Sequence, residues 1–105
     1  MTYTPFWGIF TEMGYLVTIR NSAKKSLSKV PLEVQQVFEV LVAVLQTSGP
    51  TGPHNWTNYG KLKGKKNKYH CHLTKNHEFV ACWEYLKEEI TIEVYYAGSH
   101  KDAPY

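Results

Sequence analysis

Histidine and lysine side chains with the capacity for acid–base chemistry are concentrated in one stretch of this sequence. Tyr69-His70-Cys71-His72-Leu73 alternates β-forming and polar residues at a period of two, which is typical of a strand. On such a strand, His70 and His72 point to the same face. Residues 61–68, which come just before, contain five lysines, and His100 and Tyr105 lie near the C-terminus. Imidazoles beside lysines can bind a polyanion and transfer protons, because histidine titrates near neutral pH.

The charge distribution supports a polyanionic partner more than the net charge does. The formal net charge is only +3. Residues 58–77 carry six lysines and no acid, whereas residues 78–102 carry six acids and two lysines. A segregated basic segment fits nucleic acid, although a lysine-rich loop that is merely solvated remains the alternative.

The length and composition indicate one globular domain. A chain of 105 residues with 43% hydrophobic residues can bury a single modest core. Two cysteines and no secretory signal indicate a reducing compartment, and no run of apolar residues is long enough to cross a membrane. We therefore expect a cytoplasmic protein without membrane association. Residues 1–13 are rich in aromatic side chains. Either they form an extra strand or arm, or the essential domain starts at Met13.

The elements that must position the histidines follow from periodicity. Residues 14–20 are rich in β-formers, and Asn21 and Ser22 offer N-cap chemistry for a short helix through Ser28. Pro31 suits the first position of a second helix. The glycines and prolines of residues 47–53 terminate this helix. The apolar stripe of that helix comprises Val34, Val37, Phe38, Leu41, Val44 and Leu45. After a long polar connection over residues 54–67, we expect strands at about 68–75, 79–87 and 89–97. This β-α-α-β-β-β order predicts an α+β domain with two helices on one face of an antiparallel sheet.

A two-residue turn at Asn76-His77 would fix the register of the first hairpin. It would pair Cys71 with Cys82. One face would then carry His70, His72, Phe79, Trp83 and Tyr85, and the face toward the helices would carry Leu73, Val80, Cys82 and Leu86. A different turn length would exchange these faces.

We expect neither a metal nor another cofactor. Imidazole and thiolate are zinc ligands, but Cys71 points away from His70 and His72 on a strand, and no Cys-x-x-Cys motif is present. A disulfide between Cys71 and Cys82 fits the predicted register but not a reducing compartment.

The residues match the needs of RNA cleavage. A base must deprotonate the 2′-hydroxyl, a cation must stabilise the phosphorane, and an acid must protonate the leaving 5′-oxygen. Histidines can fill both proton-transfer roles, lysines can supply the positive charge, and aromatic faces can stack bases.

The sequence also resembles the RelE/ParE superfamily of toxins from type II toxin–antitoxin systems. The resemblance covers residues 14–105 and rests on the element order together with several short motifs. They are Leu62-Lys63-Gly64, Tyr69-His70-Cys71-His72-Leu73, Val80-Ala81-Cys82-Trp83-Glu84 and Gly98-Ser99-His100-Lys101. Residues 55–105 look like a subgroup of cytotoxic translational repressors.

The resemblance implies a small endoribonuclease, an mRNA interferase that enters the ribosomal A site and is neutralised by a cognate antitoxin. By position, His70, His72, His100 and Tyr105 are the catalytic candidates. The RNA-binding candidates are Lys61, Lys63, Lys65, Lys66, Lys68 and Trp83. Free toxin is expected to be a monomer, and its partners are the antitoxin, the ribosome and mRNA.

Two other functions remain open at this point. A ParE-like toxin would inhibit DNA gyrase without cutting anything, although such an inhibitor needs no titrating face. A catalytically inactive RNA-binding relative is the other alternative, because Arg20 is the only arginine and Val80 occupies a slot where relatives often have one.

Overall fold

The computed structural model describes residues 14–105, and its elements follow the predicted α+β order. In sequence they are β1 (Leu16–Ile19), α2 (Asn21–Leu27), α3 (Leu32–Ser48), β2 (Gly60–Lys61), β3 (Lys68–His72), β4 (Phe79–Leu86), η2 (Lys87–Glu89), β5 (Thr91–Ser99) and η3 (His100–Asp102). The short strand β2 lies within the stretch that we expected to be a connection. The predicted arm or extra strand over residues 1–13 lies outside the described residues.

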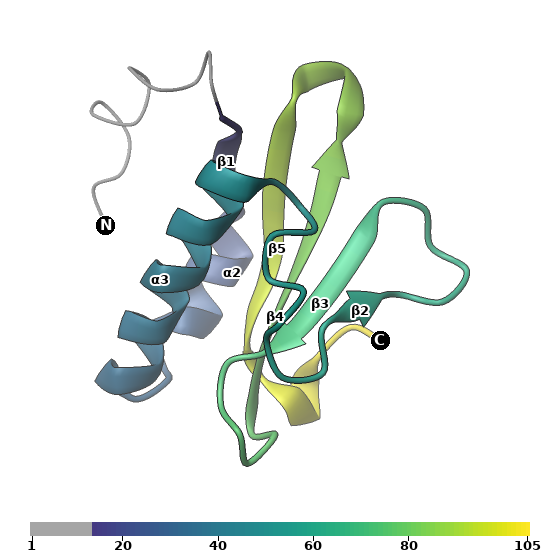
Figure 1. The fold of residues 1–105 in the computed structure, drawn as a ribbon. Coiled ribbons are helices and arrows are strands. Elements are labelled where there is room, and N and C mark those ends of the chain that lie inside the picture. The colour runs from purple at the N-terminus through teal and green to yellow at the C-terminus, as the bar shows by residue number, and fades with distance from the viewer. Residues whose placement is uncertain (1–13) are drawn as a thin grey trace.

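The five strands form one mixed sheet in the order β1-β5-β4-β3-β2. Strands β3, β4 and β5 pair antiparallel as expected, and β2 is antiparallel to β3. Strand β1, in contrast, pairs parallel with β5. The parallel pair arises because α2 and α3 intervene between β1 and the meander β3-β4-β5, so that β1 is added at the β5 edge (Figure 1).

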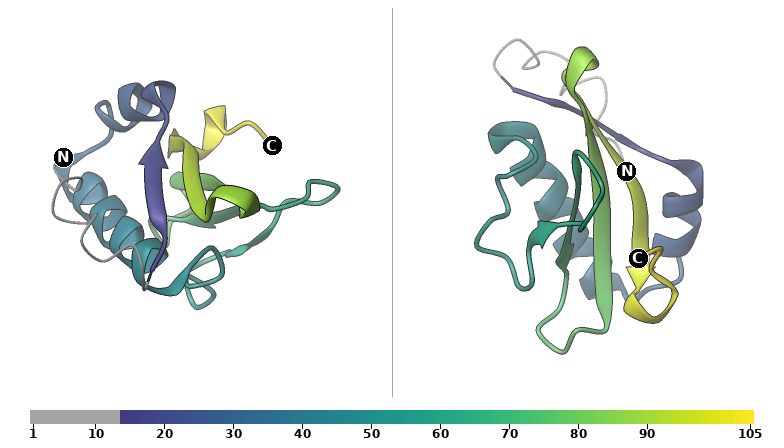
Figure 2. Two further views of the ribbon diagram at one scale, coloured as in Figure 1. Left: turned by 90° about the horizontal axis from the view of Figure 1, so that it is seen from above. Right: turned by 90° about the vertical axis from the view of Figure 1, so that its right-hand side faces the viewer.

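Helix α3 covers one face of the sheet and contributes the predicted apolar stripe to the core. Val34, Phe38, Leu41 and Leu45 are buried at helical spacing. Helix α2 packs against β5, where Gly98 leaves room for Ser26. The two helices lie on the side of the ribbon away from β2 and the loop that follows it (Figures 1 and 2).

The ends of the helices differ from the sequence prediction by about a residue. Arg20 and Pro31 are the N-cap residues of α2 and α3, and neither cap makes a side-chain hydrogen bond, so the predicted capping by Asn21 and Ser22 is wrong. Helix α3 ends at Gly49, whose φ of 85° is in the left-handed region. A Cβ there would lie 2.8 Å from the Tyr15 ring, so this position requires glycine for two reasons.

The register of the β3–β4 hairpin is one residue away from the predicted one. Cys71 pairs with Ala81, and His70 pairs with Cys82. The connection is a loop over residues 74–78 rather than a two-residue turn. Its shape is fixed by the Asn76 side chain, whose Oδ1 accepts hydrogen bonds from Thr74 Oγ1 (2.6 Å) and the Glu78 backbone N–H (3.1 Å).

This shift in register exchanges side chains between the two faces of the sheet. Tyr69, Cys71, Leu73, Ala81 and Trp83 belong to the core beneath the helices. The predicted face that combined His70 and His72 with Trp83 is therefore wrong. Trp83 is fully buried, stacks on Tyr69 at 6.1 Å between ring centroids, and donates from Nε1 to the Pro50 carbonyl (3.1 Å).

Candidate active site

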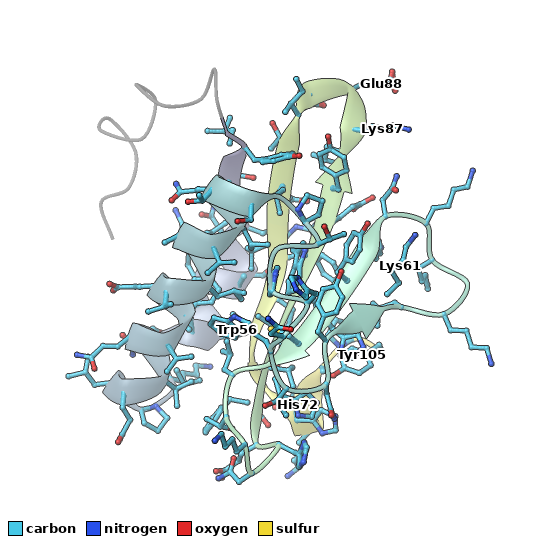
Figure 3. All side chains as sticks on the ribbon, viewed as in Figure 1. Trp56, Lys61, His72, Lys87, Glu88 and Tyr105 are labelled. Atoms are coloured by element: carbon cyan, nitrogen blue, oxygen red, sulfur yellow. The ribbon has the colours of Figure 1, made fainter. Side chains whose placement is uncertain are left out.

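The two strand histidines lie on the sheet face opposite the helices, where the C-terminal segment folds back over them. The ring of Tyr105 lies 4.9 Å from that of His70, and the ring of His100 lies 5.1 Å from that of His72, measured between centroids. His100 and Tyr105 are 6.0 Å apart. The structure therefore brings together all four predicted catalytic residues. Of these, His72 and Tyr105 are labelled in Figure 3.

The short helix η3 brings His100 to this face. Ser99 caps η3 by accepting a hydrogen bond from the Lys101 N–H at 3.1 Å. The His100 N–H donates to the Glu78 carbonyl at 2.8 Å, which joins η3 to the β3–β4 loop. The C-terminal segment is thus held at the end of the sheet that carries His72.

A further histidine, His77, joins the cluster from the β3–β4 loop. Its Nδ1 lies 2.8 Å from Nδ1 of His72, and the two ring centroids are 4.7 Å apart. The sequence predicts His77 only as a turn residue. Its sequence signal is its position five residues after His72, because a five-residue loop after β3 can bring the two rings back together.

Asn58 contacts both of these imidazoles from the connection that precedes β2. Its Nδ2 lies 3.5 Å from His72 Nε2 and 3.5 Å from His77 Nδ1. The neighbouring Thr57 accepts a hydrogen bond through its carbonyl from the His72 N–H at 2.8 Å. This second missed residue reaches the site because the long connection folds back onto the end of β3.

The environment of the strand histidines favours their neutral forms. Burial, and then the proximity of His77, His100 and His70, lowers the pKa of His72 below its usual value, and His72 is only 5% exposed. Burial and His100 lower the pKa of His70. Among the described residues, His70 Nδ1 is buried without a hydrogen-bond partner. Both imidazoles are therefore mainly neutral at pH 7, and a neutral imidazole can accept a proton.

Tyr105 presents an aromatic face rather than a titrating group. Its side chain is 50% exposed, and burial of the hydroxyl raises the pKa of Tyr105 to about 12. The hydroxyl therefore stays protonated at neutral pH. The exposed ring beside His70 can stack on a base, while the hydroxyl cannot serve as a proton acceptor of useful strength.

The predicted phosphate-binding lysines lie at the other end of β3. Lys61, Lys63, Lys65 and Lys66 are exposed, and Lys61 packs its ammonium 5.7 Å from the centroid of the buried Tyr69 ring. Lys68 is half-buried, with its ammonium 5.1 Å from the Tyr95 ring centroid. Because β3 runs from Lys68 to His72, a rise of 3.3 Å per residue separates their backbones by roughly 13 Å. A ligand must extend along β3 to meet both groups.

Trp83 and the two cysteines do not belong to this site. Trp83 has no exposed face for a base, so its predicted location in an RNA-binding surface is wrong. Cys71 and Cys82 are buried free thiols, and burial raises the pKa of each to about 12. They are not paired in the observed register, so the predicted cross-strand pair of cysteines is also wrong.

Within residues 14–105, no group of three or more histidine, cysteine, aspartate or glutamate side chains is arranged to hold a metal ion. In the same residues, no helix is long and apolar enough to cross a bilayer.

Comparison with solved structures places the architecture in the RelE-like fold class. The chain overlays the archaeal RelE–RelB complex from Pyrococcus horikoshii OT3 with a TM-score of 0.67 and 18% identity, over 85% of this chain and 98% of that one. The isolated E. coli RelE toxin gives a TM-score of 0.63 at 19% identity, over 86% and 88%. A metal-bound toxin from Helicobacter pylori gives 0.56 at 20%, over 84% and 97%.

Searches by sequence add no relative to these structural neighbours. No protein-family model matches the chain, and no curated protein matches it. The predicted RelE-like fold is thus confirmed by structure at identities near 20%.

Proposed function

We propose that this chain is the toxin of a type II toxin–antitoxin system and that it cleaves mRNA on the ribosome. The observation that carries the proposal is the proximity of His72 on β3 and His100 on η3, whose ring centroids are 5.1 Å apart on the sheet face opposite the helices. Phosphodiester cleavage needs a proton acceptor and a proton donor near one phosphate, and two imidazoles at this separation can serve both roles.

The remaining parts of the site supply binding. The exposed lysines of residues 61–66 attract the phosphate backbone, and the half-exposed Tyr105 ring offers a stacking surface beside His70. Lysine takes the place of the arginine that the resemblance leads us to expect. Arg20 follows β1, at the opposite edge of the sheet from β2, and pairs with Glu93 at 2.8 Å.

Expression of the chain in growing cells, followed by codon-resolved mapping of mRNA 5′ and 3′ ends, tests the proposal. We expect cuts within translated reading frames and none in the untranslated copy of the same message. A His72→Ala, His100→Ala double variant expressed at the same level is the matched control. Growth arrest with intact mRNA and damaged DNA would instead indicate a gyrase inhibitor and would contradict the proposal.

A further inference from the structure

The close contact between His72 and His77 restricts where protons can sit. Two imidazole nitrogens 2.8 Å apart must share one hydrogen, because two N–H groups would clash and two lone pairs would repel. One ring is therefore the donor and the other the acceptor at Nδ1. The pair cannot become doubly cationic without breaking this contact.

Asn58 decides which ring donates. The Nδ2 atom of Asn58 can only donate, and it faces His72 Nε2 and His77 Nδ1, each at 3.5 Å. The Nε2 of His72 is then an acceptor without a hydrogen, so neutral His72 carries its hydrogen on Nδ1. The single lone pair of His77 Nδ1 serves the closer contact, 2.8 Å from His72 Nδ1. The shared hydrogen consequently belongs to His72 Nδ1, which donates to His77 Nδ1.

The geometry points to His77 as a positioning residue that holds His72 in the tautomer protonated at Nδ1, which leaves Nε2 of His72 as the proton acceptor. The catalytic role of His72 Nε2 rests on the proposed function, whereas the tautomer of His72 is a property of the free protein. The titratable groups beside His72 are His70 on β3 and His100 on η3. Lys75 and Glu78 flank His77 in the sequence of the β3–β4 loop.

The tautomer defines one half of the cleavage step. When substrate displaces the Asn58 amide from its 3.5 Å contact, Nε2 of His72 takes the proton of the 2′-hydroxyl. The 2′-oxygen bonds to phosphorus, and the bond from phosphorus to the 5′-oxygen breaks. A proton from His100 goes to the leaving 5′-oxygen, so the products are a 2′,3′-cyclic phosphate and a 5′-hydroxyl. His72 leaves this step as an imidazolium whose Nδ1–H still donates to the neutral His77, which stabilises the new charge.

The backbone at His77 supports a positioning role. Its φ of 63° lies in the left-handed region, where a residue with a Cβ is uncommon and histidine, asparagine and aspartate are the more tolerated types. The Asn76 side chain, which hydrogen-bonds to Thr74 Oγ1 and to the Glu78 carboxylate, holds the loop in this conformation. The structure thus maintains an unfavourable φ at the residue that contacts His72.

Nitrogen-15 NMR of the full chain, with the imidazole nitrogens correlated to their ring protons, tests the tautomer directly. At a pH above the titration of His72, we expect a protonated Nδ1 and an unprotonated Nε2 for His72, and the opposite assignment for His77. An Nε2–H tautomer for His72, which would also mean that the Asn58 amide is oriented the other way, overturns the inference.

Two variants at the same position separate the hydrogen bond from the backbone. Both glycine and asparagine accept a positive φ. His77→Gly removes the acceptor, and we expect single-turnover cleavage to fall roughly 10- to 100-fold, the range for losing the partners that orient metal-ligating histidines. His77→Asn places an amide oxygen where Nδ1 was, and we expect it to restore most of the rate and the His72 tautomer. Equal losses in both variants, with His72 unchanged in tautomer, contradict the positioning role.

The two proposals fail in different ways. If wild-type chain cuts no mRNA, the proposed function is wrong, and the NMR result on His72 still decides the tautomer. If wild type cuts mRNA and His77→Gly cuts equally well, the function stands and the role of His77 is wrong. Thermal unfolding of each variant shows whether a lost rate reflects lost folding.

Discussion

The imidazole of His72, at the end of β3, lies 5.1 Å from that of His100, which enters the site from the C-terminal helix η3. The two residues are far apart in sequence, and they meet because β5 ends beside the β3–β4 loop and η3 turns back over the sheet. This contact leads to a first prediction about the chemical step.

Replacing either histidine by alanine should slow cleavage with little effect on ribosome binding. We expect His72→Ala and His100→Ala each to lower the single-turnover rate roughly 10²–10⁴-fold, the range for loss of a general acid or base. His54→Ala is the control, because His54 lies in the preceding connection, where its ring contacts the Thr51 carbonyl at 3.2 Å. Wild-type rates in both His72→Ala and His100→Ala would show that these imidazoles are structural.

The cleavage rate should follow a bell-shaped pH profile. Its acidic flank should lie at a lower pH than the pKa of free histidine. The pKa of His72 is lowered by burial and by its histidine neighbours, so His72 stays neutral to a pH below about 6.5. Cleavage should therefore be lost as the pH falls through this lowered pKa. Single-turnover rates on programmed ribosomes between pH 5 and 9 measure it, and an acidic flank clearly above 6.5 would contradict the assignment of His72 as base.

Neutralising exposed lysines of β2 and of the loop between β2 and β3 should change the salt dependence of binding and not the stability. We expect Lys61→Gln, Lys63→Gln and Lys65→Gln together to reduce the log–log salt slope for RNA by roughly 2, since each phosphate contact to a single strand contributes about 0.7. The matched control changes three exposed lysines of the helical layer, Lys24, Lys25 and Lys29. If both triple variants alter the slope equally, residues 61–65 make no specific contribution.

Tyr105 should act through its ring and not through its hydroxyl. Because the pKa of Tyr105 is raised to about 12, the hydroxyl is protonated throughout the working range, and Tyr105→Phe should cleave at nearly the wild-type rate. Tyr105→Ala should weaken RNA binding by about 1–3 kcal/mol, the usual value for one stacked base. Titration of a fluorescent RNA measures the binding affinity of both variants, and single-turnover cleavage measures the rate of Tyr105→Phe. A Phe variant that binds as weakly as the Ala variant would show that the hydroxyl is required.

The cognate antitoxin should carry an acidic segment that is partly disordered when free. Silencing requires covering the exposed lysines of residues 61–66 and the histidine face, and an extended acidic segment can cover both. Binding of the antitoxin should weaken with salt, and the lysine triple variant should lose part of that dependence. A structure of the toxin–antitoxin pair in which both surfaces stay open would contradict this occlusion. It would indicate that the antitoxin inhibits sterically, by making the complex too large for the ribosomal A site.

Periodicity alone determined much of this protein. The stripe from Val34 to Leu45 predicted α3, the alternation around His70 predicted β3, and the placement of His70 and His72 on one face depends only on the period of a strand. The lysines of residues 61–66 are exposed because a run of charges cannot be buried unpaired. These features are local, so the sequence contains them directly.

Tertiary structure decided what the histidines contact. The Asn76 side chain lengthens the β3–β4 loop, and the shift of one residue moves Trp83 into the core and leaves the histidine face to Tyr105 and His100. The same loop carries His77 to within 2.8 Å of His72, and the folded connection adds Asn58. Since a strand's faces alternate at every residue, a single step in register, set by one turn, determines which side chains form the site.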